Sequence, residues 1–298
     1  MKLAARSMTL LGSAALVVSA LIATPAVAQS DPHSTCTGTA KAPGVITGTY
    51  WSDVTVKGVC AVNAGKAVVH GNLTLATGST LLAAFGLNDM TGKGSSSLRV
   101  TGNVVVGDDA AMLLGCLPTS FPCIDDPNQS SPTLSSHDVV GGSIIENAPL
   151  GVIVHDSWIG ENVTQLGGGG GVNCNPTGVF ALFGSPVFST YEDSTIRGSL
   201  TIANVRSCWM GTARVAIWGN ATYLNNTLAD PDAIEIVSNN IHGDLVCSRN
   251  SMVWDSGELG NTLFPRHPQP NSVQGQRIGQ CRLNSPTSAT DKPGPGLF

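Results

Sequence analysis

The sequence has few charged residues: Asp, Glu, Lys and Arg make up 12% of its 298 residues, against about 25% in an average soluble protein. It has no cluster of Lys and Arg, and its 20 acidic side chains outnumber its 15 basic ones. Binding to nucleic acid or to anionic lipid depends on clustered Lys and Arg side chains, so we expect neither as the principal partner. Gly, Ser, Thr and Asn take the place of the missing charges. Such a surface suits an extracellular structural or carbohydrate-facing protein, although export and a turn-rich fold would give the same composition.

The sequence also lacks a Cys-x-x-Cys pair, which weakens both a zinc interpretation and a thiol-redox interpretation. An even number of cysteines in an exported chain instead favours disulfides. Pairing of sequence neighbours suggests 36–60, 116–123, 174–208 and 247–281, with other pairings left open. The eight disulfide candidates all follow residue 28: Cys36, Cys60, Cys116, Cys123, Cys174, Cys208, Cys247 and Cys281.

Residues 1–28 have the pattern of a signal peptide. Lys2 and Arg6 give a basic start, the stretch from Thr9 to Ala23 is mostly apolar, and Ala26-Val27-Ala28 supplies a small-x-small cleavage site. We expect a secreted protein cleaved after Ala28; the alternative is an uncleaved anchor. No second apolar run is long enough to span a membrane.

A short pattern recurs after residue 65: a β-branched residue, a spacer, Gly, a small polar residue and an apolar alternation. Gly permits backbone conformations that other residues resist, and Asn, Ser or Asp bonds nearby backbone, so each copy predicts a strand, a bend and a new strand. The best copy is Ile241-His242-Gly243-Asp244-Leu245-Val246-Cys247, and the marker glycines are Gly71, Gly102, Gly142, Gly160, Gly198, Gly219 and Gly243.

The spacing of these glycines roughly fits a unit of about 20 residues or its double, which is the size of one solenoid coil. Stacked coils bury the apolar faces that one coil cannot bury alone. The alternative is a β-sandwich, whose strands typically recur every 8–12 residues. We therefore predict an all-β solenoid.

The run from Ile234 to Cys247 resembles the "strand, Asn, x, Ile, x, Gly, strand" coils of right-handed parallel β-helix proteins, the architecture of pectate lyases. It is more similar to uncharacterised secreted bacterial β-helix repeat proteins. The resemblance covers roughly residues 66–250 and implies a right-handed parallel β-helix, but says little about activity.

The expected organisation is a signal peptide at 1–28, an N-terminal leader and cap at 29–65, and β-helix repeats at 66–256. Proline-rich residues 115–136 predict a loop insertion, and the glycine run 167–171 predicts a flexible turn. Prolines in residues 257–298 predict an irregular C-terminal tail tied back by Cys281. Residues 29–48 are expected to form a loose leader pinned by Cys36.

Acidic residues are scattered and do not reproduce the motif set of polygalacturonases or the converging acids of a calcium site. His155-Asp156 follows an apolar strand and is the first pair to inspect, although we expect a solvated turn there because neighbouring residues point to opposite faces. We therefore assign no catalytic, cofactor-binding or metal residues and expect no cofactor. The candidate acids and bases are Asp108, Asp109, Glu146, His155, Asp156, Glu161, Asp232, Glu235, His242 and Asp244.

Two further sets of residues have ordinary explanations. Asn72, Asn162 and Asn220 lie in Asn-x-Ser/Thr sequences, but they coincide with the turn of the repeat, so backbone capping explains them. The five tryptophans are expected to be partly buried packing residues rather than sugar platforms.

Three function hypotheses remain. The first is an exported, non-enzymatic β-helix with a structural, surface or adhesive role. The second is a carbohydrate-active lyase or hydrolase, which would need two acids and a base converging in one groove. The third is a non-catalytic carbohydrate-binding protein with exposed tryptophan rings along one face. Cell-wall or extracellular polysaccharide is the partner class that these hypotheses share.

Overall fold

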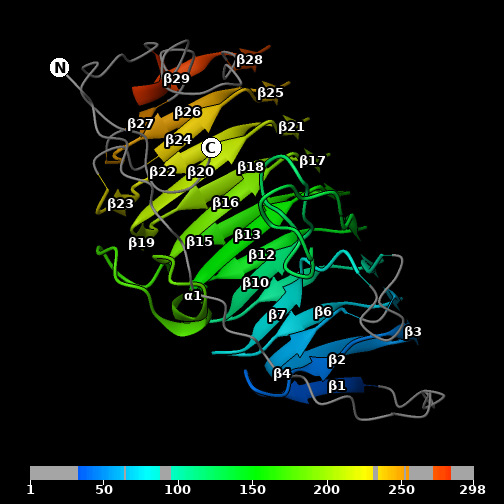
Figure 1. Cartoon of the computed structure of the whole chain (residues 1–298). Helices are drawn as coiled ribbons and strands as arrows, with labels where there is room; N and C mark the ends of the chain where they lie inside the picture. The colour runs from blue at the N-terminus through cyan, green and yellow to red at the C-terminus, as the bar shows by residue number, and fades with distance from the viewer. Residues whose placement is uncertain are drawn as a thin grey trace.

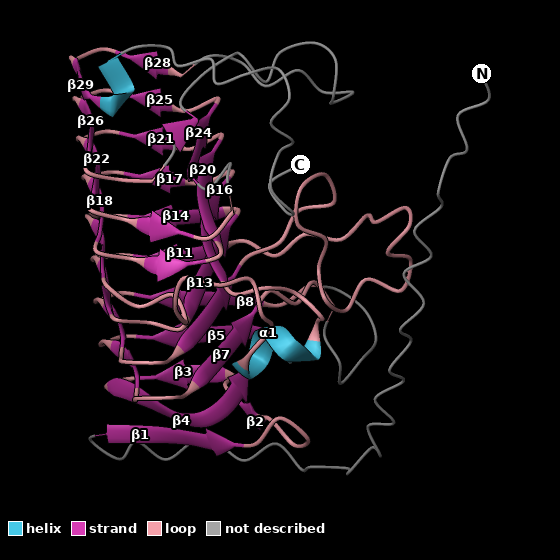
Figure 2. Ribbon diagram, turned by 90° about the vertical axis from the view of Figure 1, so that its left-hand side faces the viewer, coloured by secondary structure: helices cyan, strands magenta, loops and turns pink. Residues whose placement is uncertain are grey.

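The chain folds into a parallel β-solenoid in which three sheets run along the stack of coils (Figures 1 and 2). This computed structural model describes residues 33–63, 65–87, 95–230, 234–251, 253–254 and 271–282. Strands of successive coils pair in parallel and in register, for example β5 with β8 and β18 with β22. The predicted all-β solenoid is confirmed. The predicted signal peptide lies outside the described residues.

Each full coil contributes one strand to each sheet. Sheet 1 contains β3 (Gly48–Tyr50), β5 (Lys66–Val69), β8 (Ser97–Val100), β11 (Asp138–Val140), β14 (Ser157–Ile159), β17 (Thr195–Ile196), β21 (Ala216–Ile217), β25 (Asn240–Ile241) and β28 (Ser272–Val273). Sheet 2 contains β1 (His33–Gly38), the first part of β4 (Asp53–Ala61), β6 (Leu73–Leu75), β9 (Val104–Val106), β12 (Ile144–Asn147), β15 (Val163–Leu166), β18 (Leu200–Ala203), β22 (Ala221–Leu224), β26 (Leu245–Ser248) and β29 (Arg277–Gly279).

Sheet 3 contains β2 (Gly44–Val45), the second part of β4, β7 (Thr80–Ala83), β10 (Ala111–Leu114), β13 (Gly151–His155), β16 (Phe188–Glu192), β20 (Trp209–Ala213), β24 (Ile234–Val237) and β27 (Val253–Trp254). Outside these sheets lie the paired strands β19 (Arg206–Ser207) and β23 (Thr227–Leu228), the helix α1 (Gly178–Leu182) and the 3-10 turn η2 (Gln280–Arg282).

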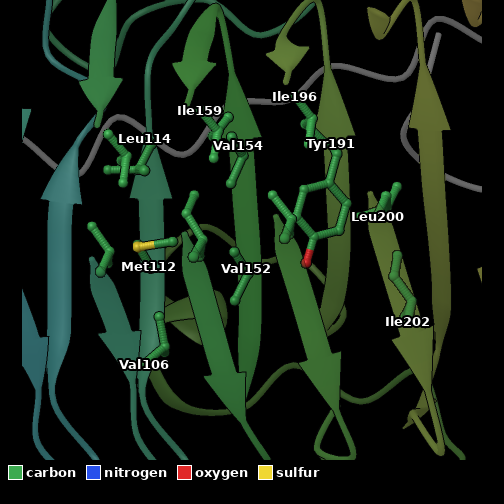
Figure 3. Packing of buried hydrophobic residues seen from close by; sticks show 14 of the residues in the cluster. Val106, Met112, Leu114, Val152, Val154, Ile159, Tyr191, Ile196, Leu200 and Ile202 are labelled. Atoms are coloured by element: carbon green, nitrogen blue, oxygen red, sulfur yellow. The ribbon is translucent and has the colours of Figure 1, made fainter. Parts of the chain in front are cut away.

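The core is a column of aliphatic side chains that point inward from all three sheets. Figure 3 shows Met112, Val152 and Leu200 among these buried side chains, with the ring of Tyr191 beside them. Alternate residues of a strand face opposite sides, so one apolar residue in two is enough to fill the interior. Sheet 3 is different, because strands β13 and β20 are buried along their whole length and are therefore covered on both faces.

The turn between sheets 1 and 2 carries the repeated Gly and small polar residue. The side-chain oxygen at this position accepts a hydrogen bond from the backbone N–H at the same position in the next coil, as Asn72 does from Asn103 at 2.9 Å and Asn220 from Asp244 at 2.8 Å. This turn column runs through Asp53, Asn72, Asn103, Ser143, Asn162, Ser199, Asn220, Asp244 and Gln276.

The reason for the glycines differs from our expectation. We predicted an unusual backbone angle at Gly243, but its φ lies outside the left-handed region. Instead, a Cβ there would overlap Asn220 Oδ1 and would lie 2.7 Å from the Gly219 carbonyl oxygen. The glycine is needed because successive turns approach closely. One marker is also shifted: Glu161 occupies the glycine position of its coil, and Gly160 occupies the spacer position.

Both ends of the solenoid extend further than expected. Residues 33–48, predicted as a loose leader, form β1, β2 and the start of β3, because β1 pairs with β4 and is tied to it by Cys36–Cys60. Residues 271–282, predicted as tail, form β28, β29 and η2 and continue the turn column through Gly275 and Gln276. The rest of the predicted tail lies outside the described residues.

Two loops leave the solenoid on the side of sheet 3 (Figure 2). Residues 115–137 connect β10 to β11 and contain the disulfide Cys116–Cys123. Residues 167–187 connect β15 to β16, begin with the five glycines and contain α1; Cys174 of this loop is bonded to Cys208. The fourth disulfide joins Cys247 in β26 to Cys281 in η2. The four disulfides link the sequence neighbours.

Candidate functional site

Four ionisable side chains from three successive coils meet where the sheet 3 strands end. His155 is the last residue of β13 and lies in register with Glu192, the last residue of β16. Asp193 and Arg214 occupy the next position in their coils, at the turn toward sheet 1, with φ values of 50° and 57°. The parallel register therefore gathers residues that are far apart in the sequence. We call His155, Glu192, Asp193 and Arg214 the strand-end cluster.

The distances within the strand-end cluster are short. The Arg214 guanidinium donates from Nε to Asp193 Oδ1 at 2.6 Å and from Nη2 to Asp193 Oδ2 at 2.9 Å. The same Nη2 also donates to Glu192 Oε2. The other oxygen of Glu192, Oε1, accepts from the Thr190 hydroxyl at 2.9 Å and lies 3.5 Å from His155 Nε2. Arg214 thus holds both carboxylates, and Glu192 Oε1 faces the imidazole.

The loop of residues 115–137 covers this cluster. The Ser120 hydroxyl donates to Asp193 Oδ2 at 2.5 Å, and the Phe121 ring lies 4.7 Å from the His155 ring. At the base of the loop, the Asp138 carboxylate accepts from the Leu98 and Gly115 backbone N–H groups at 2.7 and 2.8 Å. As a result, His155 and Glu192 are each only 2% exposed, whereas Arg214 is 33% exposed.

Burial controls the electrostatics of the cluster. It lowers the pKa of His155 to about 3, so the imidazole is neutral at neutral pH. It raises the pKa of Glu192 to about 8, although Arg214 and the Thr190 hydroxyl oppose the shift. Burial also raises the pKa of Asp193, but the hydrogen bonds from Arg214 and Ser120 outweigh it, so the net pKa is lowered.

The expectation of a solvated turn at His155-Asp156 is wrong for His155. The histidine packs beneath Phe121 because the inserted loop covers the outer face of sheet 3. Asp156 turns away from it with a φ of 41° and contacts His137 at 3.3 Å. Glu192, Asp193, Arg214 and Ser120 were not among our candidate residues. The only sequence signals are that Ser120 lies inside an insertion and that Glu192 and Asp193 lie in the coil that follows one.

The other candidate acids do not join the cluster. Asp108 and Asp109 are exposed and line a cavity of about 270 Å³ with Pro149, Leu150 and Arg206, at the opposite end of the sheet 3 strands. Glu161 is exposed and accepts from the Ser143 hydroxyl. His242 and Asp244 lie at the turn between sheets 1 and 2, and Glu235 is buried in β24. Asp232 lies outside the described residues.

Glu146 is inside the solenoid. Its Oε2 accepts from the Tyr191 hydroxyl at 2.6 Å, and its Oε1 has no hydrogen-bond partner among the described residues. Burial raises the pKa of Glu146 to about 8, against the Tyr191 hydrogen bond, which lowers it. A carboxyl enclosed in this way cannot meet a polymeric substrate.

The four tryptophans whose side chains the structure describes divide into two groups. Trp209 is buried, as expected for packing, whereas Trp51, Trp158 and Trp218 are 71, 37 and 47% exposed beside sheet 1. Arg197 lies 4.0 Å from the Trp218 ring centre, and His242 stacks on that ring at 4.5 Å. These two residues belong to the coils before and after Trp218, so both faces of its ring are covered. Trp51 stacks on His70 at 4.3 Å and lies in the first coil of sheet 1.

No family model, no curated protein and no solved structure matches this chain. Within the described ranges, no helix is long and apolar enough to cross a membrane. The four disulfides favour an oxidising, extracellular environment.

Proposed function

We propose that this chain is an exported, non-enzymatic β-helix that serves as a structural or adhesive element at the cell surface. The observation that carries the proposal is the turn column, which links successive coils by side-chain to backbone hydrogen bonds from Asp53 to Gln276. Each bond ties one coil to the next, and the disulfides Cys36–Cys60 and Cys247–Cys281 secure the two ends of the described stack. Such a construction suits a rigid rod in an oxidising environment.

A carbohydrate-active enzyme is the competing proposal. It would use the strand-end cluster, where two acids and an imidazole converge. However, His155 and Glu192 are 2% exposed beneath the loop of residues 115–137, and the cavity of about 270 Å³ lies at the other end of the strands. General acid–base catalysis requires a group within hydrogen-bond reach of the substrate. This placement favours a structural role for the cluster.

Polysaccharide remains the ligand class that we propose for adhesion, through the surface around Trp51. That side chain is 71% exposed, and its stacking on His70 keeps the ring in a fixed orientation. A fixed, exposed aromatic ring supplies contact area at low entropic cost. Trp218, whose two faces are covered, provides a matched control.

One co-sedimentation experiment separates these proposals. The disulfide-intact chain is mixed with insoluble cell-wall and plant polysaccharides, and pelleted protein and released soluble sugar are both measured. We expect sedimentation without sugar release, weakened several-fold by Trp51→Ala and unchanged by Trp218→Ala. If the chain releases sugar and Glu192→Gln abolishes this release, the non-enzymatic proposal is wrong. If Trp51→Ala leaves sedimentation unchanged, the proposal that the surface around Trp51 binds polysaccharide is wrong.

A further inference from the structure

Among the residues that the structure describes, the imidazole of His155 has no hydrogen-bond partner on either nitrogen. Buried polar groups in native proteins nearly always have one, so an unpaired ring that is 2% exposed needs a physical explanation. Its Nε2 points at Glu192 Oε1, but the 3.5 Å between them does not form a hydrogen bond. The ring is therefore held close to an acceptor without bonding to it.

We propose that His155, Glu192 and Asp193 bind one divalent transition-metal ion of the zinc class. One donor atom from each of the three residues lies within 4.8 Å of the others. Zinc is bound at about 2.0–2.2 Å by His nitrogen and carboxylate oxygen, so neighbouring ligands of a tetrahedral site are separated by roughly 3.3–3.6 Å. The 3.5 Å between His155 Nε2 and Glu192 Oε1 fits such an edge.

A divalent ion would change the charge of the site. Burial keeps Glu192 mostly protonated in the metal-free chain, so the ion would displace this proton as it binds. The ionised Glu192 and Asp193 would then carry two negative charges, and the bound guanidinium of Arg214 cancels one of them. With the ion, the site would carry a net charge of +1. Each carboxylate oxygen has two lone pairs, so Asp193 Oδ1, which accepts from Arg214 Nε, retains one for a metal, whereas Asp193 Oδ2 already accepts from both Arg214 and Ser120.

The donor set selects the class of ion. A neutral imidazole with carboxylates suits zinc, copper, nickel or iron, whereas calcium and magnesium prefer all-oxygen sites with more ligands. Neither ring nitrogen of His155 is hydrogen-bonded among the described residues, so one can donate its lone pair to the ion. The ion would join two neighbouring coils, because His155 ends β13 and Glu192 ends β16. This inference does not depend on the proposed adhesive role.

The test uses the full, disulfide-intact chain after removal of adventitious metal with a chelator. Zinc is titrated against a chromophoric competitor to obtain stoichiometry and Kd, and histidine side-chain NMR identifies the ring that responds. We expect one zinc ion per chain and a shift of the His155 resonances. His155→Gln and Glu192→Gln should each weaken binding at least tenfold, since removing one ligand of three leaves an incomplete site. His242→Gln and Glu161→Gln, which alter a histidine and an acid elsewhere on the solenoid, should leave Kd unchanged.

Each outcome decides the proposal. The absence of saturable zinc binding overturns it, as does binding that shifts His137 or His242 instead of His155, or binding that survives His155→Gln. If the two buried variants fail to fold, as judged by circular dichroism, the NMR response of the unmodified chain and Asp193→Asn provide the decision. Asp193 is 15% exposed, and its amide variant retains a hydrogen-bond acceptor for Arg214.

Discussion

Replacement of Gly243 by alanine tests the explanation of the turn column directly. The backbone there adopts a conformation open to any residue, so strain in φ contributes nothing. A methyl group would nevertheless overlap Asn220 Oδ1 and lie 2.7 Å from the Gly219 carbonyl oxygen. Relief requires Asn220 to move, which would break its 2.8 Å hydrogen bond from the Asp244 N–H.

The size of the effect follows from these contacts. Overpacking costs typically about 1–3 kcal/mol and a lost hydrogen bond about 0.5–1.5 kcal/mol. Alanine also restricts the unfolded chain, which offsets about 0.4–1 kcal/mol. We therefore expect Gly243→Ala to lower the free energy of unfolding by about 0.5–4 kcal/mol. The control is Gly78→Ala, where φ is 66° and no atom lies within 4 Å of the added Cβ. That change should cost about 1–2 kcal/mol through φ alone.

A double-mutant cycle with Asn220→Ala distinguishes the two costs. Urea unfolding under non-reducing conditions measures each free energy. In the Asn220→Ala background the clash with Oδ1 is gone, so Gly243→Ala should cost about half as much, while the cost of Gly78→Ala should be unchanged because the sites are far apart along the solenoid. Equal costs of Gly243→Ala in both backgrounds would refute the close-approach explanation.

Two further predictions concern carboxyl groups. Burial raises the folded-state pKa of Glu146 to about 8 from a reference value of 4.5, so the folded chain keeps a proton that the unfolded chain loses, and stability should fall as pH rises through this window. Glu146→Gln removes this ionisation, so the free energy of unfolding should fall less between pH 5 and 8, by on the order of a few kcal/mol. Urea unfolding measures this fall in both proteins, and an identical fall would contradict the prediction. Asp244→Asn keeps the side-chain oxygen that accepts from the Gln276 N–H at 2.8 Å, so this variant should have the melting temperature of the unmodified chain. Asp244→Leu loses this hydrogen bond and should melt at a lower temperature. Equal melting temperatures of the two variants would show that the hydrogen bond contributes nothing to stability.

The solenoid and its turn positions could be predicted because their determinants are local. A Gly followed by Asn, Ser or Asp between two apolar alternations specifies a bend wherever it occurs, and Asn72, Asn162 and Asn220 do cap backbone there. The reason for the glycine could not be predicted from one coil, because the atom that a Cβ would strike belongs to the preceding coil. The repeat pattern also misplaced one marker, because Glu161 occupies the glycine position of its coil and Gly160 lies one residue before it.

The strand-end cluster shows where local reasoning stops. His155 and Glu192 are neighbours because a loop of residues 167–187, inserted between their coils, leaves the parallel register of β13 and β16 intact. The distance along the sequence therefore says nothing about their separation in space. A second loop, 115–137, then buries the histidine that alternation alone would have left in solvent. The loop 115–137 follows β10 of sheet 3, so an insertion that obscures the repeat in the sequence is also the element that covers the one convergent group of acids and imidazole among the described residues. In a solenoid of this kind, interruptions of the repeat are therefore the places to look for chemistry, and the residue to examine is the last one of the strand beside the insertion.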